Sequence, residues 1–198
     1  MDTRRNTSVG AKGFITGLLA LAAFIGPLGQ SSPARSQIVV NGADRRQEAM
    51  VDWAIRRFRA AGLEVPPLEI DFGSAETGAR CTLGGGFYEG GVLDLCTGVS
   101  VNAYARRVTL HELSHAWADR ALGNAQERGF EQLRGLSNWN DWDRPWDERG
   151  GEQVAEIISW GIGEGVFLPT IPDNSPDQLA VSYEYLTGME PPVLDAAD

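Results

Sequence analysis

The sequence predicts an α+β fold in which a small antiparallel or mixed sheet precedes a helical second half. Strand-like patterns occur early and helix-like patterns occur late, an order typical of folds that segregate strands from helices. Residues 68–72 alternate apolar and acidic side chains, which is the pattern of a half-buried strand. The glycine-rich segment 80–98 is expected to form a β-hairpin or meander, because its glycines separate short apolar runs.

Helical periodicity accounts for most of the remaining chain. An amphipathic pattern extends from Asp44 to Ala61, and Gly62 stands where that helix should stop. Further helices are expected at 103–122, 127–136, 152–162 and 176–187. Pro145 interrupts any regular helix through the loop 135–150, which is rich in Trp, Asp and Asn.

Residues 1–36 have the order of regions found in a secretory signal peptide. Basic residues come first, an apolar run follows from Phe14 to Ile25, and Ala34-Arg35-Ser36 supplies small residues near the expected cleavage site. A stable membrane anchor is not expected, because a spanning helix needs about 20 apolar residues. We therefore expect cleavage near Ser36, a secreted extracellular protein and one domain at 37–198.

The expected mature domain is acidic. Removing residues 1–36 takes away four basic residues and one acidic residue, which changes the formal net charge from −10 to about −13. Such a field repels nucleic acid and anionic lipid, so neither is an expected partner.

Cys81 and Cys96 are the two cysteines of the chain. In an exported protein an even pair is expected to oxidise, so we predict one disulfide between them. Metal binding by this pair is disfavoured, because its spacing is not that of a CxxC site.

Both histidines of the chain lie in one short segment, His111-Glu112-Leu113-Ser114-His115. Residues four apart on a helix share one face about 6 Å apart along the axis, so both imidazoles can bind one cation. This is the HExxH pattern of zinc peptidases. It predicts Zn²⁺ as cofactor, His111 and His115 as its ligands, and Glu112 as the general base that takes a proton from water.

A catalytic zinc needs a third protein ligand, and the chain has no third histidine. Asp119 is excluded, because eight residues of straight helix place it about 12 Å from His111. Glu152 on the next long helix is the preferred ligand, and Glu156 one turn later is expected to accept the N–H of a zinc-bound histidine. Spacing alone leaves open which of the two glutamates is the ligand. A solvated helix face is the competing interpretation.

This set of residues resembles the gluzincins, zinc peptidases with HExxH on one helix and a glutamate ligand on a later one. The matching residues are His111, Glu112, His115, Glu152 and Glu156. The resemblance covers roughly residues 92–162 and implies a zincin-like fold with a second metal-bearing helix. The metzincin pattern is absent, because Ala118 and Ala121 stand where it requires glycine and histidine.

Two groups of residues have open roles. Many gluzincins stabilise the oxyanion with a further histidine or tyrosine, and this chain has no histidine left for that purpose. The candidates for this role are Tyr88, Tyr183, Tyr185 and Arg149, and the sequence does not choose among them. Trp139, Trp142 and Trp146 either line a substrate cleft or pack as structural aromatics.

Taken together, these patterns predict a secreted zinc metallopeptidase with a peptide or protein substrate. A non-catalytic zinc-binding or cell-surface interaction module on the same fold is the alternative. Hydrolysis of a non-peptide amide, such as a cell-wall cross-link, is a third hypothesis, because HExxH describes the catalytic centre and not the cleft walls. Cleavage specificity and oligomeric state do not follow from the sequence.

Overall fold

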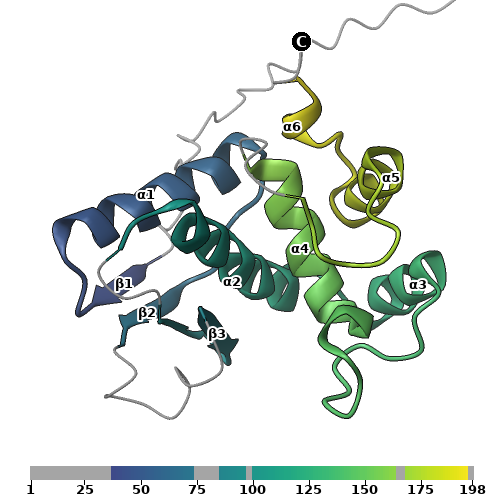
Figure 1. Cartoon of the computed structure of the whole chain (residues 1–198), viewed down its shortest axis with the longest axis horizontal. Coiled ribbons are helices and arrows are strands. Elements are labelled where there is room, and N and C mark those ends of the chain that lie inside the picture. Colours follow the sequence, from purple (N-terminus) through teal and green to yellow (C-terminus); the bar gives the residue numbers. More distant parts are fainter. Residues whose placement is uncertain (1–36, 74–84, 97–99, 164–167, 196–198) are drawn as a thin grey trace, which may run out of the picture. The chain divides into compact units, whose positions relative to one another are not determined.

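The computed structural model describes residues 37–73, 85–96, 100–163 and 168–195 (Figure 1). Within these ranges it contains one four-stranded mixed sheet and six α-helices, which agrees with the predicted α+β class. The predicted signal peptide at 1–36 lies outside the described residues. None of the helices described is both long enough and apolar enough to cross a membrane.

The sheet has the strand order β1-β2-β4-β3. β1 (Ile38–Asn41) and β2 (Leu68–Phe72) run parallel, with α1 (Arg45–Ala60) connecting them. β4 (Val92–Leu95) lies parallel to β2, and β3 (Gly86–Glu89) pairs antiparallel with β4 as the last strand of the order. The expected hairpin is therefore present. Gly90 and Gly91 form its turn with φ of +58° and +87°, a conformation that favours glycine.

The five predicted helices are all present, and none is displaced by more than one turn. They are α1, α2 (Ala103–Ala121), α3 (Asn124–Arg134), α4 (Gly150–Ile162) and α5 (Pro176–Thr187). Three short elements were not predicted, namely β1, the 3-10 helix η2 (Trp146–Glu148) and α6 (Pro192–Asp195). Each is too short to show a periodic pattern, and β1 carries three consecutive apolar residues without alternation.

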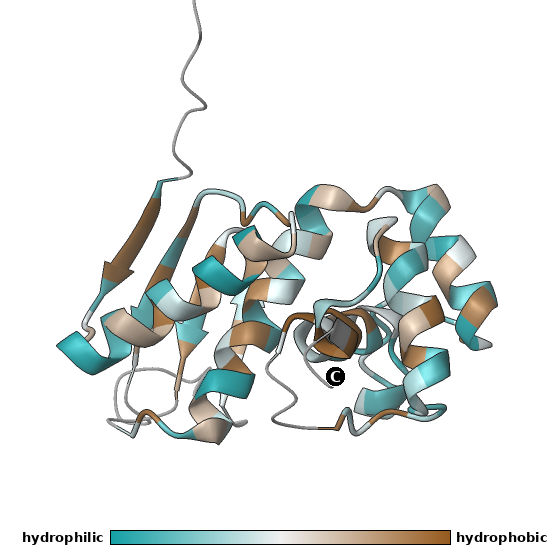
Figure 2. Ribbon diagram, turned by 90° about the horizontal axis from the view of Figure 1, so that it is seen from above, coloured by the Kyte–Doolittle hydropathy of each residue, from teal (hydrophilic) through white to brown (hydrophobic). Residues whose placement is uncertain are grey.

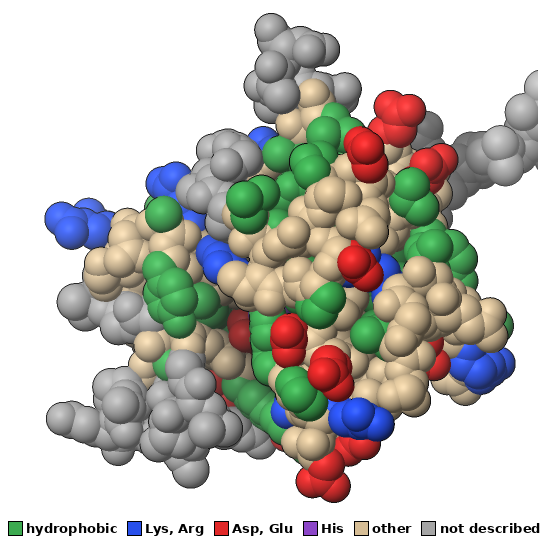
Figure 3. Space-filling model, turned by 45° about the vertical axis from the view of Figure 1, so that its right-hand side comes forward, with side chains coloured by type: hydrophobic (Ala, Val, Ile, Leu, Met, Phe, Trp, Pro, Cys, Tyr) green, Lys and Arg blue, Asp and Glu red, His purple; other side chains and the backbone are tan. Residues whose placement is uncertain are grey.

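The core joins the sheet to α2 and α4. Its fully buried side chains include Ile70 and Leu93 from the sheet, Leu110 and Leu113 from α2, and Ile157 and Ile158 from α4. The outer helices carry both hydrophilic and hydrophobic residues along their length in Figure 2, as amphipathic helices do. Acidic side chains lie mainly on the right and lower parts of the face shown in Figure 3.

The middle of α2 is buried even at its polar positions. Thr109 and Ser114 satisfy their hydroxyls within the helix, on the carbonyls of Ala105 and Leu110 at 2.8 and 2.7 Å. His111 and Glu112 have no bond to a carbonyl of their own helix, and buried polar groups need partners. Their partners must therefore come from other parts of the chain.

Candidate metal centre

α2 and α4 pack together and place charged side chains along one seam. On α2, Arg107, His111 and His115 are spaced four residues apart and share one face. On α4, Glu152 and Glu156 are also four apart. Glu156 contacts Arg107 and His111, while Glu152 contacts His111 and His115, so the two helices run antiparallel along the seam.

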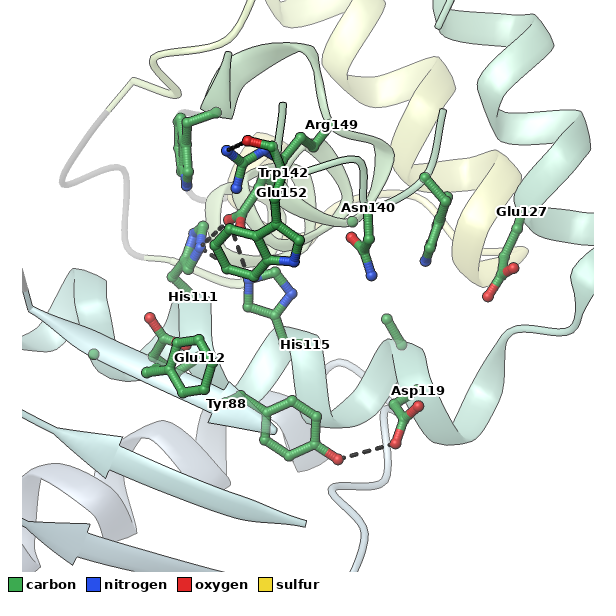
Figure 4. A pocket seen from close by; sticks show the side chains of 16 residues that line it. Tyr88, His111, Glu112, His115, Asp119, Glu127, Asn140, Trp142, Arg149 and Glu152 are labelled. Carbon is green, nitrogen blue, oxygen red and sulfur yellow. Dashed lines mark hydrogen bonds and ion pairs between the residues drawn. The ribbon is translucent and has the colours of Figure 1, made fainter. Parts of the chain in front are cut away.

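Three potential ligand atoms converge at one end of this seam (Figure 4). His111 Nε2 lies 3.1 Å from Glu152 Oε2, His115 Nε2 lies 3.2 Å from the same oxygen, and the two Nε2 atoms are 3.2 Å apart. Ligands that share a tetrahedral zinc at about 2.0 to 2.1 Å lie about 3.3 Å from one another. The ligand triangle of His111, His115 and Glu152 could therefore hold a metal ion.

The charge of the centre fits a divalent cation. Glu112, Glu152 and Glu156 supply three negative charges in or beside the buried seam, and Arg107 supplies one positive charge. With neutral imidazoles, two negative charges lack compensation in surroundings of low polarity, which is costly. A divalent cation at the triangle removes that cost.

The pKa shifts have the same origin. Burial lowers the pKa of His111, but hydrogen bonds with Glu152 and Glu156 and the charge of Glu112 outweigh burial and raise the pKa to about 10. Burial raises the pKa of Glu152, yet its contacts with both histidines hold that pKa far below the usual range. The centre thus attracts positive charge, whether a proton or a metal cation.

Glu156 orients His111 through Nδ1, the ring nitrogen that does not belong to the triangle. Glu156 is 1% exposed as a whole residue, and its Oε1 lies 3.1 Å from His111 Nδ1. Its Oε2 accepts hydrogen bonds from Arg107 Nη2 at 2.7 Å and from the Thr170 N–H at 3.1 Å. A carboxylate at Nδ1 keeps the proton there and leaves the Nε2 lone pair for a metal. The structure places Glu152, and not Glu156, in the ligand triangle.

Glu112 lies beside the triangle without belonging to it (Figure 4). β3 lies close to Glu112. Gly86 allows this close approach, because a Cβ at Gly86 would lie 2.5 Å from Glu112 Cγ. Burial raises the pKa of Glu112 against the opposing charges of His111 and His115 and the opposing effect of the backbone N–H of Tyr88 on β3. A carboxylate with a raised pKa is suited to taking up and returning a proton.

The start of α4 is built on two glycines that pack against the preceding loop. The N–H groups of Gly150 and Gly151 donate to the carbonyls of Asn138 and Trp139 at 3.2 and 3.0 Å. A Cβ at Gly151 would lie 2.5 Å from Asn140 Oδ1. This packing places Glu152 in the first turn of α4, where the positive end of the helix favours a carboxylate.

Two cavities flank the ligand triangle. The first, of about 280 Å³, extends past His115 towards Tyr88, Asp119 and Glu127 (Figure 4). The second, of about 300 Å³, extends towards Tyr104 and Arg107. Four residues line both cavities, namely Gly86, His111, Glu112 and Trp146. The two cavities therefore adjoin at His111 and Glu112.

The three tryptophans of the loop 135–150 all line the first cavity. Trp146 stacks on the imidazole of His111, with ring centroids 5.7 Å apart. Trp142 is exposed and faces Phe87 of β3 at 6.5 Å. Trp139 is half-buried and also packs edge-on against Phe130 at 6.2 Å. Trp142 and Trp146 act as cleft walls, whereas Trp139 also serves packing.

The structure separates the four candidates for oxyanion stabilisation. Tyr183 is buried in the core, and the Tyr185 hydroxyl donates to the Gln126 carbonyl at 3.2 Å, so neither lines the two cavities. Tyr88 and Arg149 do line the first cavity. The Tyr88 hydroxyl donates to Asp119 at 3.1 Å, and Asp119 itself lies outside the ligand triangle, as helix geometry requires.

Sequence reasoning missed two contributors, Arg107 and Gly86. Arg107 had a usable signal, because it precedes His111 by four residues and therefore shares its helix face. Gly86 had none, since its role depends on how closely β3 approaches α2.

Cys96 forms a disulfide bond. Cys81, its predicted partner, lies outside the described residues, so this pairing stays a prediction.

Comparisons of the chain with protein-family models, with curated proteins and with solved structures found no match. The resemblance to gluzincins thus stays a prediction from the motif residues. The function has to be argued from the site itself.

Proposed function

We propose that this protein is a secreted zinc-dependent metallopeptidase in which Glu112 is the general base. The observation that carries the proposal is the separation of roles at one cavity. His111, His115 and Glu152 converge as three ligand atoms, while Glu112 lines the same cavity outside the triangle. Three protein ligands leave one coordination position open, which is the composition of catalytic zinc sites and not of closed structural ones.

Different groups of the chain serve different steps of hydrolysis. When bound, zinc acts as a Lewis acid that polarises a carbonyl and makes a water molecule easier to deprotonate. Glu112 accepts the proton of that water and passes it to the leaving amine. Gly86 of β3 packs directly against the Glu112 side chain, and Glu156 keeps His111 in the correct tautomer.

The walls of the cleft support an extended peptide as the substrate. β3 is the last strand in the order of the described sheet, and Gly86, Phe87 and Tyr88 line the first cavity. A peptide bound in the first cavity would lie against these three residues of β3. The two cavities on either side of the triangle then receive side chains that flank the bond to be cut.

The test is a comparison of matched variants of the chain from Gln37 onward. The wild type should bind one zinc and cut members of a peptide library. Glu112→Gln should keep the zinc and lose about 100- to 10,000-fold in rate, the range for removal of a general base. Glu152→Ala should lose metal affinity sharply. Glu184→Gln is the control, because Glu184 is exposed on α5 and lines neither cavity.

Two outcomes would remove the proposal. One is a protein that binds one zinc and cuts no member of the library. The other is a Glu112→Gln variant as active as the wild type. Export is tested separately by sequencing the N-terminus of the protein recovered from the medium, which should begin near Gln37.

A further inference from the structure

We infer that Arg107 is a positioning residue of the metal centre, which orients His111 by holding the carboxylate of Glu156. The inference rests on the metal-binding part of the proposed function and not on peptidase activity. It adds Arg107 to the contacts along the seam between α2 and α4. Arg107 contacts Glu156, Glu156 contacts His111, and His111 contacts Glu152.

The two oxygens of Glu156 have different partners. Oε2 accepts from Arg107 Nη2 at 2.7 Å and from the Thr170 N–H at 3.1 Å. Oε1 is left for His111 Nδ1 at 3.1 Å. Two donors on one oxygen define the plane of the carboxylate, so the other oxygen has a defined direction. The His111 ring takes its orientation from that direction.

The helix spacing makes this arrangement rigid. Arg107 and His111 are one turn apart on the same face of α2, so the distance between their side chains is set by the helix itself. Glu156 approaches both from α4, and its side chain is 2% exposed. The Arg107 side chain is 25% exposed, so the charged contact is buried on the Glu156 side alone, where the carboxylate depends on protein donors.

Arg134 provides a comparison, because it also ties α4 to the segment that follows it. Its Nε donates to Gln153 Oε1 at 2.9 Å, and its Nη1 donates to the Asp173 carbonyl at 3.0 Å. Arg107 makes the corresponding connection through Glu156 and Thr170. The difference is that Gln153 does not contact the ligand triangle. If Arg107 were only a clamp, loss of either arginine should have the same kind of effect.

The experiment measures zinc affinity by competition with a chromophoric chelator, together with thermal stability in excess chelator. Arg107→Met should weaken zinc binding about 10- to 100-fold, the range for groups that orient metal ligands. Arg107→Lys should recover most of that loss, because a single donor atom, Nη2, makes the bond to Glu156. Arg134→Met should lower thermal stability and leave zinc affinity within threefold of the wild type.

A double-mutant cycle tests whether Arg107 acts through Glu156. In a Glu156→Gln background, Arg107→Met should cause little further loss of zinc affinity, because the effects of residues in one chain of contacts are not additive. The visible absorption spectrum of the cobalt-substituted protein reports the same geometry. It should change in Arg107→Met and stay unchanged in Arg134→Met.

The inference is overturned by unchanged zinc affinity in Arg107→Met, or by an equal loss of zinc affinity in Arg134→Met. It is also overturned if the losses of zinc affinity in Arg107→Met and Glu156→Gln are fully additive. A wild-type protein that binds no zinc removes both this inference and the proposed function. A protein that binds zinc but cuts no peptide overturns the proposed peptidase activity alone. The role of Arg107 is then still decided by the zinc affinities of the variants.

Discussion

Gly86 permits the sharpest test of how β3 and α2 cooperate. In Gly86→Ala the new Cβ would lie 2.5 Å from Glu112 Cγ and 2.9 Å from its Cδ and Oε1. Ordinary carbon contacts are about 3.5 Å or more, so β3 or the Glu112 side chain must move by about 1 Å. Either movement disturbs the close packing of β3 against the Glu112 side chain.

A shift of about 1 Å in a catalytic group can cost about 100-fold in rate, so we expect a loss of that order in kcat/KM on the best peptide substrate. Overpacking should cost about 1 to 3 kcal/mol, and each kcal/mol corresponds to about 2 to 4 °C in melting temperature. Zinc affinity should stay within threefold of the wild type, because the three ligand atoms are not touched.

The control is Gly123→Ala, since a Cβ at Gly123 meets nothing within 4 Å. It should change neither kcat/KM nor zinc affinity, and should cost only the small loss expected when alanine replaces glycine at a helix N-cap. A Gly86→Ala protein that hydrolyses peptide at the wild-type rate would refute the claim that the contact between β3 and Glu112 matters for catalysis.

The remaining predictions concern pH and the core. In chelator, the pKa of His111 is about 10 in the folded chain against 6.5 as its ordinary value, so its stabilising contribution is complete below about pH 6.5. That contribution is lost as pH rises towards 10, so the melting temperature in chelator should fall over this range; no fall contradicts the assigned pKa. Burial raises the pKa of Tyr183 to about 12, and its buried hydroxyl has no hydrogen-bond partner among the residues described. Tyr183→Phe should therefore stabilise the fold by about 1 to 3 kcal/mol in chemical denaturation, and a loss of stability would reveal an unseen partner.

Much of the candidate site was predictable because its residues follow the period of an α-helix. The four-residue spacings of His111 with His115 and of Glu152 with Glu156 place each pair on one helix face, whatever the rest of the chain does. The exclusion of Asp119 follows from the same local geometry and agrees with its position outside the triangle. The long helices were predicted for the same reason.

Other features depend on contacts between distant segments. β1 pairs in parallel with a strand that follows a whole helix, and its apolar run alone does not distinguish a strand from a short buried segment. The role of Gly86 depends on the distance between a strand and a helix. The cavities depend on where the loop 135–150 folds back, with Trp146 stacked over His111.

Helix periodicity alone predicts which side chains share a helix face, because the period of a helix is a local property of the backbone. The register between α2 and α4 depends on the folded protein, since that register is set by core packing along both helices. The register puts Glu152 opposite the two Nε2 atoms and Glu156 opposite Nδ1 of His111. It also puts Arg107 on Glu156, and so turns two helical pairs of residues into one connected metal centre.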